Sequence, residues 1–212
     1  MKNKKFLVIG AVALVIIGFI VATKLYRQSV EDPSAAVAQD LLVRPHAITL
    51  GRAGAKVIMV EFYDPECESC RQFDPYTKEL LKEFAGRLQI VFRYAPFHAN
   101  SRLAIKMLEA ARKQNRYWET LEVFFANQHE WGSHHAPRPE LLWTYLPGVG
   151  VDPTQLKVDM VDPAITQLID QDVADGQQLG INGTPTFYVN GEPLLSFGPD
   201  QLRELIVKHI EN

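Results

Sequence analysis

The chain contains only two cysteines, Cys67 and Cys70, and they are separated by Glu68 and Ser69. At this spacing the two thiols can form one disulfide with each other, and the second thiol can resolve a mixed disulfide carried by the first. Because the chain has no other cysteine, a mixed disulfide has to form with another molecule. The spacing therefore predicts thiol–disulfide exchange with Cys67 and Cys70 as the reacting residues, and it requires no cofactor besides their own redox-active disulfide.

Two alternatives use the same pair of thiols. One is an inert structural disulfide, although a loop of two residues contributes little stability through chain entropy. The other is part of a metal site, for example in a Cu(I) metallochaperone, because soft thiolates bind Cu(I). A non-catalytic binding module, whether a metallochaperone or an assembly factor, is thus the alternative to an enzyme.

The residues around the cysteines follow a strand–helix–strand pattern. Residues 56–63 (KVIMVEFY) are rich in β-branched and aromatic side chains, which predicts a buried strand. Residues 67–84 carry apolar side chains at spacings of three and four, which predicts an amphipathic helix, and residues 88–94 (LQIVFRY) predict a second strand. This β-α-β order predicts a parallel sheet and places Cys67 at a helix N-terminus, where unpaired N–H groups favour a thiolate.

The middle of the chain has a helical pattern. Apolar side chains at helical spacing predict four helices, around residues 103–111, 117–125, 141–145 and 165–173. Core packing accounts for their apolar faces, so none of them indicates a cofactor. On the same helices, Asp172 and Asp175 are expected on a solvated face.

The C-terminal part returns to strand-forming residues. Residues 186–189 (TFYV) and 193–197 are predicted to form a hairpin around Asn190–Gly191, a dipeptide typical of a type I′ turn. Residues 199–210 predict a last amphipathic helix. The complete order describes an α/β domain interrupted by a helical insertion.

A second motif, Gly183-Thr184-Pro185, stands directly before the strand at 186–189. Proline cannot donate a ladder hydrogen bond and suits the first residue of a strand. Together with the Cys-x-x-Cys unit, this motif resembles the thioredoxin superfamily, and the helical insertion narrows the resemblance to DsbA-type periplasmic thiol–disulfide oxidoreductases. The resemblance runs from about His46 to the C-terminus, and it includes the segments 61–64 (EFYD), 93–98 (RYAPFH) and 115–125 (NRYWETLEVFF).

The resemblance implies a thioredoxin-like fold and a role for each matching residue. Cys67 would be the exposed nucleophile and Cys70 the buried resolving thiol, while Thr184 and Pro185 would form the cis-proline loop that docks the substrate chain. It also implies extracytoplasmic substrates that contain cysteines, and a membrane redox partner that reoxidises or reduces the pair.

The dipeptide between the cysteines departs from the pattern of the strongly oxidising members. In the strongly oxidising members of the family that this chain resembles, the dipeptide is Pro-His, and its histidine stabilises the nucleophilic thiolate. Here the dipeptide is Glu68–Ser69, and Asp64 and Glu66 stand just upstream. Because negative charge disfavours a thiolate, we predict that the pKa of Cys67 is less depressed than in those members, with Glu68 and Ser69 as tuning residues. The sequence leaves the direction of electron flow open.

The N-terminus carries a membrane-targeting signal. A basic head, 1–5, precedes an uncharged apolar run from Phe6 to Thr23, which as a helix would be about 27 Å long. The run exceeds the apolar region of typical cleaved signals, and the best cleavage pattern, Ala36-Val37-Ala38, lies well beyond it. We therefore predict a membrane anchor or uncleaved signal at 1–24, a tether at 25–45, and a thioredoxin-like domain at 46–212 with its helical insertion at about 98–180.

Charge predicts how this anchor is oriented. Lys2, Lys4 and Lys5 precede the run and two basic residues, Lys24 and Arg27, follow it. By this difference of one the positive-inside rule favours a cytoplasmic N-terminus and a single-pass protein of the inner or cytoplasmic membrane, with its domain facing the periplasm or cell exterior. That compartment is oxidising, which suits a lone cysteine pair. The 212-residue chain has a net charge of −3, so no basic surface for nucleic acid is expected.

Three histidines lie close together in the sequence, His129, His134 and His135. Their spacing positions no further ligand type, so a solvated loop is the expected interpretation and no metal site is predicted. A monomer is expected, because only a short segment separates the apolar run from the domain.

Overall fold

The computed structural model describes residues 40–133 and 135–211. The compact unit that contains the sheet and the helices that cover it begins at Leu41. The predicted anchor at 1–24 and most of the predicted tether lie outside the described residues. Among the described residues, no helix is both long and apolar enough to cross a bilayer.

A five-stranded mixed sheet forms the centre of the domain. Its strands are β1 (Ile48–Gly51), β2 (Val57–Tyr63), β3 (Leu88–Tyr94), β4 (Thr186–Val189) and β5 (Glu192–Pro193), in the spatial order β1-β3-β2-β4-β5. As predicted, β2 and β3 pair in parallel, whereas the other neighbours pair antiparallel. Both parallel strands are buried on both faces, which explains their nearly continuous apolar sequences.

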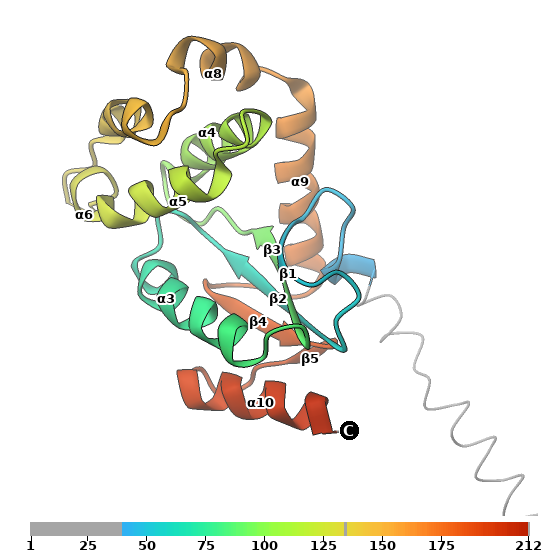
Figure 1. The fold of residues 1–212 in the computed structure, drawn as a ribbon. Helices are drawn as coiled ribbons and strands as arrows, with labels where there is room; N and C mark the ends of the chain where they lie inside the picture. The colour runs from blue at the N-terminus through green and yellow to red at the C-terminus, as the bar shows by residue number, and fades with distance from the viewer. Residues whose placement is uncertain (1–39, 134, 212) are drawn as a thin grey trace, which may run out of the picture. The chain divides into compact units, whose positions relative to one another are not determined.

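Helices cover both faces of this sheet. They are α3 (Glu68–Glu83), α4 (Ser101–Lys113), α5 (Tyr117–Ala126), α6 (Gln128–Trp131), α7 (Leu142–Tyr145), α8 (Pro153–Asp159), α9 (Pro163–Gln178) and α10 (Pro199–Glu211), with 3-10 turns at Pro139–Leu141 and Leu146–Val149. Figure 1 shows α3 and α10 on one side of the sheet, α9 on the other, and α4 to α8 gathered as a separate helical layer. Helices α4 to α9 lie between β3 and β4 in the chain, where the sequence predicts a helical insertion.

The topology brings three chain segments together at the end of the sheet where β2 and β3 finish. The cysteine motif follows β2 and residues 95–100 follow β3, so both lie at the carboxyl ends of parallel strands. Residues 183–185 precede β4, which runs antiparallel to β2, and therefore lie at the same end. The fold thus assembles the two sequence motifs from positions far apart in the chain.

The predicted hairpin is present, but its second strand is shorter than expected. Asn190 (φ 47°) and Gly191 (φ 86°) both have the positive φ that a type I′ turn requires. The prediction of a strand over 193–197 is wrong beyond Pro193, because β5 is only Glu192–Pro193. The chain then leaves the sheet, and the ring of Phe197 packs on that of Phe73 in α3, with 4.6 Å between the ring centroids.

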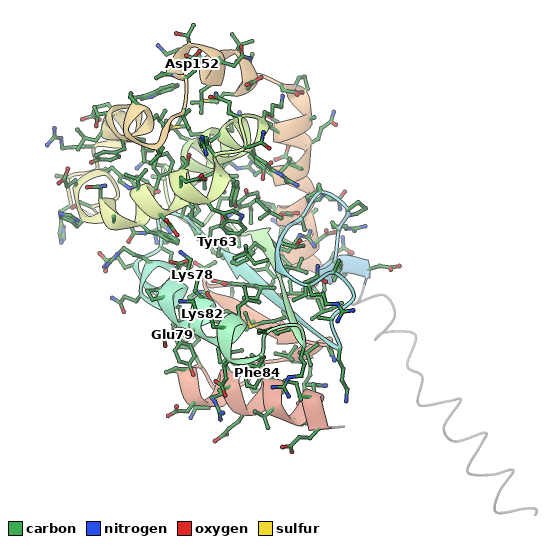
Figure 2. The ribbon with its side chains drawn as sticks, viewed as in Figure 1. Tyr63, Lys78, Glu79, Lys82, Phe84 and Asp152 are labelled. Atoms are coloured by element: carbon green, nitrogen blue, oxygen red, sulfur yellow. The ribbon has the colours of Figure 1, made fainter. Side chains whose placement is uncertain are left out.

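Two helices of the insertion begin at Asp-Pro pairs. Asp152 accepts a hydrogen bond from Thr154 N (2.8 Å) at the start of α8, and Asp162 accepts one from Ala164 N (2.9 Å) at the start of α9. In each pair the proline occupies the first helical turn, where its missing N–H has no cost. Figure 2 shows Asp152 at the outer end of the helical layer.

Asp172 and Asp175 are buried, so the expectation of a solvated face is wrong for both. Arg93 of β3 explains the difference: its guanidinium donates to Asp172 Oδ1 (2.9 Å) and to Asp175 Oδ2 (2.6 Å). Burial alone would raise the pKa of Asp175, but hydrogen bonds from Arg44, Arg93 and Gln171 lower it to about 2. A buried arginine on the sheet therefore neutralises carboxylates that the helix pattern alone places in solvent.

The same ion cluster attaches the segment before β1 to the domain. Arg93 Nη1 donates to the carbonyl oxygens of Leu41 (2.6 Å) and Leu42 (2.9 Å), and Arg44 pairs with Asp175 at 2.7 Å. Leu42 is buried in the small core cluster on the α9 side of the sheet. Residues 41–45, predicted as the end of the tether, thus belong to the compact unit in the structure.

A chain of buried hydroxyl groups connects the sheet with the helical layer. The Tyr117 hydroxyl of α5 is hydrogen-bonded to the hydroxyl of Tyr63 at the end of β2 and, at 2.8 Å, to that of Tyr94 at the end of β3. Tyr94 in turn donates to Glu109 Oε1 of α4 at 2.6 Å. Figure 2 shows Tyr63 where the sheet meets the helical layer. These contacts fix the helical layer against the end of the sheet that carries the cysteines.

Candidate active site

Cys67 occupies the N-cap of α3, as predicted. Its backbone is extended (φ −77°, ψ 123°), and its side chain makes no capping hydrogen bond, so the first N–H groups of α3 are available to the sulfur. The Cys67 thiol donates to the backbone oxygen of Thr184 at 3.2 Å. The two sequence motifs therefore meet at this sulfur atom.

The two thiols differ in burial and in acidity. Cys67 is 7% exposed and Cys70 1%, so Cys67 is the more accessible of the two but is itself largely buried. A hydrogen bond from Cys70 lowers the pKa of Cys67 to about 5 against an opposing effect of burial, with help from the side chain of Thr184 and from the N–H groups of Ser69 and Cys70. Burial raises the pKa of Cys70 well above its usual range. Cys67 is thus the thiolate of the pair near neutral pH, which is the form that attacks disulfides.

The dipeptide between the cysteines faces solvent. Glu68 and Ser69 are both exposed, and the N–H of Ser69 is among the groups that lower the pKa of Cys67. The tuning role of the two side chains stays a prediction. The acidic residues upstream are engaged elsewhere: the Glu66 carboxylate accepts hydrogen bonds from Asn100 N (2.7 Å) and Asn100 Nδ2 (2.8 Å) at the start of α4.

The Thr184–Pro185 peptide bond is cis, in line with the cis-proline loop that the resemblance implies. Pro185 is buried, whereas Thr184 is partly exposed, and the Thr186 hydroxyl donates to Gly183 O at 2.7 Å. This bond bends the loop back on itself just before β4. The Thr184 backbone is held against Cys67 in this arrangement.

Glu61 is a buried carboxyl group that neither sequence motif includes. It lies on β2, is 3% exposed, and its Oε2 atom has no hydrogen-bond partner among the described residues. Burial raises the pKa of Glu61 to about 8, and the charges of Asp74 and Cys67 add to the shift. Its own charge contributes to the raised pKa of Cys70. An acidic residue within an apolar strand is the signal from which this site could have been inferred.

Gln128 is a second residue that sequence patterns do not reveal. It is 1% exposed, and its amide nitrogen donates to Pro65 O (2.9 Å) and Cys67 O (3.0 Å), while its Oε1 accepts from Arg71 Nε (3.0 Å). The side chain comes from α6, so the helical layer contributes directly to the backbone around Cys67. No local pattern marks this contact, because a glutamine in a short helix is ordinary.

The histidines near residue 130 do not join the cysteines. His129 is exposed and lies 3.8 Å from Glu130, His135 is exposed, and His134 lies outside the described residues. Within 40–133 and 135–211, no group of three or more His, Cys, Asp or Glu side chains is arranged to hold a metal ion.

The chain is similar to several known proteins. A family model described as thioredoxin matches residues 44–208. The Na⁺/H⁺ antiporter NhaA of Herminiimonas arsenicoxydans is 31% identical over 144 residues, which cover 68% of this chain and 22% of the antiporter, so the chain spans about a fifth of that relative's length. A probable disulfide bond formation protein D of Bacillus cereus is 27% identical over 221 residues, covering all of both chains.

A solved structure agrees with this sequence match. The crystal structure of oxidised BdbD from Bacillus subtilis superimposes with a TM-score of 0.66 at 28% sequence identity, and the match covers 77% of this chain and 92% of that one. The similarity extends over both the sheet and the helical insertion, because it takes in more than three quarters of the chain.

Proposed function

The chain belongs to the thioredoxin family, and we propose that it is a protein thiol–disulfide oxidoreductase that exchanges disulfides through Cys67 and Cys70 outside the cytoplasm while tethered to a membrane. The observation that carries the proposal is the position of the Cys67 sulfur, which lies at the N-terminus of α3 and 3.2 Å from the backbone oxygen of Thr184 in the cis-proline loop. A thiol with a pKa of about 5 is ionised near neutral pH and can attack a disulfide. The buried second thiol can then resolve the mixed disulfide within the same chain.

The geometry supports a two-step exchange. In the reduced protein, the Cys67 thiolate attacks one sulfur of a substrate disulfide, a mixed disulfide forms, and the other substrate sulfur leaves as a thiolate. Cys70 then loses its proton and attacks the Cys67 sulfur, which releases the second substrate thiol and leaves the Cys67–Cys70 disulfide. The substrate gains two electrons and the protein loses two. Run in reverse, the same steps oxidise a substrate dithiol.

The acidity of Cys67 bears on the direction of this exchange. A thiolate that is stable at neutral pH stabilises the reduced protein relative to the disulfide, so it makes the disulfide a better oxidant. This supports the transfer of electrons from substrate dithiols to the protein. The protein then requires a membrane redox partner that removes the electrons again.

The membrane tether rests on the sequence. The apolar run at 6–23 with Lys2, Lys4 and Lys5 before it favours a cytoplasmic N-terminus and an external domain. The similarity to the Bacillus cereus relative also extends over the full length of both chains. The substrates we propose are extracytoplasmic proteins that contain cysteines.

Thiol labelling in intact cells tests this topology. After mild reduction of protoplasts or spheroplasts, a membrane-impermeant maleimide is expected to label Cys67, because the domain faces outward and Cys67 is the more accessible thiol. The measurement is the labelled fraction relative to lysed cells. A Cys67→Ser/Cys70→Ser chain, which has no cysteine, supplies the blank. Labelling that appears only after lysis would place the domain inside and refute the proposed orientation.

A further inference from the structure

The Asp64 carboxylate collects hydrogen bonds from the turn that follows β3. Its Oδ2 atom accepts from Phe97 N (2.8 Å), His98 Nδ1 (2.8 Å) and the Ser101 hydroxyl (2.7 Å), and its Oδ1 atom accepts from Glu66 N (2.8 Å). The Asp64 side chain is fully buried. All of these partners are donors, which is the environment of an ionised carboxylate.

The backbone of the same residue contacts both cysteines. Asp64 N donates to Cys70 Sγ at 3.4 Å, and Asp64 O accepts from Cys67 N at 3.0 Å. A group that holds the Asp64 side chain in place therefore also holds the Asp64 backbone, which contacts both cysteines. His98 is the member of that set that can carry a positive charge, and when protonated it forms an ion pair with Asp64.

His98 lies between Asp64 and solvent. Its side chain is 25% exposed, so it can exchange a proton with water, while Asp64 is not exposed. Partial burial lowers the pKa of His98, but the hydrogen bond and charge of Asp64 and the charges of Cys67 and Glu66 raise it, and the net shift is upward. Asp64 is in contact with the ring at 2.8 Å, and the charges of Cys67 and Glu66 act on it from nearby.

We propose that His98 and Asp64 form a positioning pair for thiol–disulfide exchange, in which Asp64 holds the protonated His98 ring beside the segment that carries the two cysteines, and the positive charge stabilises the Cys67 thiolate and thus the reduced cysteine pair. The inference rests on the proposed function and deepens it. It assigns this role to a histidine in the turn after β3. The position directly before the second cysteine, where a histidine could also stand, is Ser69 in this chain.

The reduction potential is the readout that separates this role from a merely structural one. His98→Gln keeps a hydrogen-bond donor for Asp64 but removes the positive charge. The equilibrium constant for oxidising glutathione should fall about three- to tenfold, equivalent to a potential about 15–30 mV more negative. The pKa of Cys67, followed by thiolate absorbance, should rise in the same variant.

Three further variants make the test specific. His98→Lys keeps a cation beside Asp64 and is expected to retain the wild-type potential. His129→Gln removes an exposed histidine far along the chain from the cysteines and is expected to change nothing. In an Asp64→Asn background, where the pair is already broken, adding His98→Gln should shift the potential less than it does in the wild type.

The outcomes are distinguishable. If His98→Gln has the wild-type potential, or if His98→Lys shifts the potential as far as His98→Gln does, the proposed pair has no electrostatic role and the inference is overturned. If the effect of His98→Gln is the same in the wild type and in the Asp64→Asn background, Asp64 does not hold the cation. If the wild-type pair forms no disulfide with glutathione at any ratio, the proposed function itself fails together with this inference.

Discussion

Cys67→Ser is expected to abolish disulfide exchange, whereas Cys70→Ser is expected to convert the protein into a trap for its substrates. Cys67 has the lowered pKa and the greater accessibility, so we expect it to make the first attack. Without Cys70, nothing within the chain resolves the mixed disulfide, because the chain has no third cysteine. On a non-reducing gel, Cys70→Ser should accumulate adducts that disappear with a reductant.

The comparison between the two variants is the control. Both replace one sulfur by one oxygen, so differences in folding are matched as closely as the site allows. Cys67→Ser leaves only a buried thiol whose pKa is raised, and few or no adducts are expected. Equal amounts of adduct from the two variants would show that Cys67 is not the nucleophile.

Glu61→Gln is expected to slow the step in which Cys70 gains or loses its proton. Cys70 has a raised pKa and is buried, so it needs a nearby proton acceptor when it attacks and a donor when it leaves. Glu61, with a pKa of about 8 and an unpaired oxygen, can be both near neutral pH. Removing a positioned acid or base typically costs about 10²-fold in rate, and stopped-flow measurement of each exchange step checks this.

Stability gives a second signature of Glu61. Its pKa is raised from 4.5 to about 8, so the folded protein holds more protons than the unfolded chain between these values. The free energy of unfolding should therefore fall as pH rises from about 4.5 to 8, and Glu61→Gln should remove that part of the fall. Glu79→Gln, which changes an exposed carboxylate of α3 (Figure 2), is the matched control and should alter neither rate nor pH dependence. An unchanged resolving step in Glu61→Gln would contradict the proton role.

The parts of the fold predicted from the sequence are those with a strong local pattern. The two parallel strands, the helix after Cys67 and the Asn190–Gly191 turn follow from periodicity and turn chemistry, and the structure confirms them. The helix α8 is not predicted, although Asp152–Pro153 is a recognisable helix start. The short strand β1 also escapes prediction, because its four residues pair only at the sheet edge.

The errors concern interactions between distant segments. From the helix pattern alone, Asp172 and Asp175 are expected on a solvated face. In the structure they bind Arg93, which lies about eighty positions earlier in the chain. The segment 41–45 is predicted as part of the tether, but in the structure the same arginine donates to carbonyl oxygens of this segment. Periodicity reports burial but not the partner that neutralises a buried charge, so such contacts require the fold.

The candidate site divides in the same way. Motifs locate Cys67, Cys70, Thr184 and Pro185, and the structure brings them together at one sulfur atom. In the sequence, Asp64 counts only as a negative charge that opposes the thiolate. In the structure its carboxylate instead binds the turn after β3 and His98, a role that depends on two strands ending side by side.

Counting the disulfides that one protein molecule transfers tests the central claim most directly. The purified full chain is mixed with a large excess of a reduced, unfolded protein that contains cysteines, in a glutathione redox buffer, and the native disulfides formed are counted over time. An oxidoreductase is expected to transfer many disulfides per molecule, and the Cys67→Ser/Cys70→Ser chain none above background. If each molecule delivers at most one disulfide while its reduced thiols bind Cu(I) tightly, the pair is a metal-binding site and the account of it as a catalytic couple is contradicted.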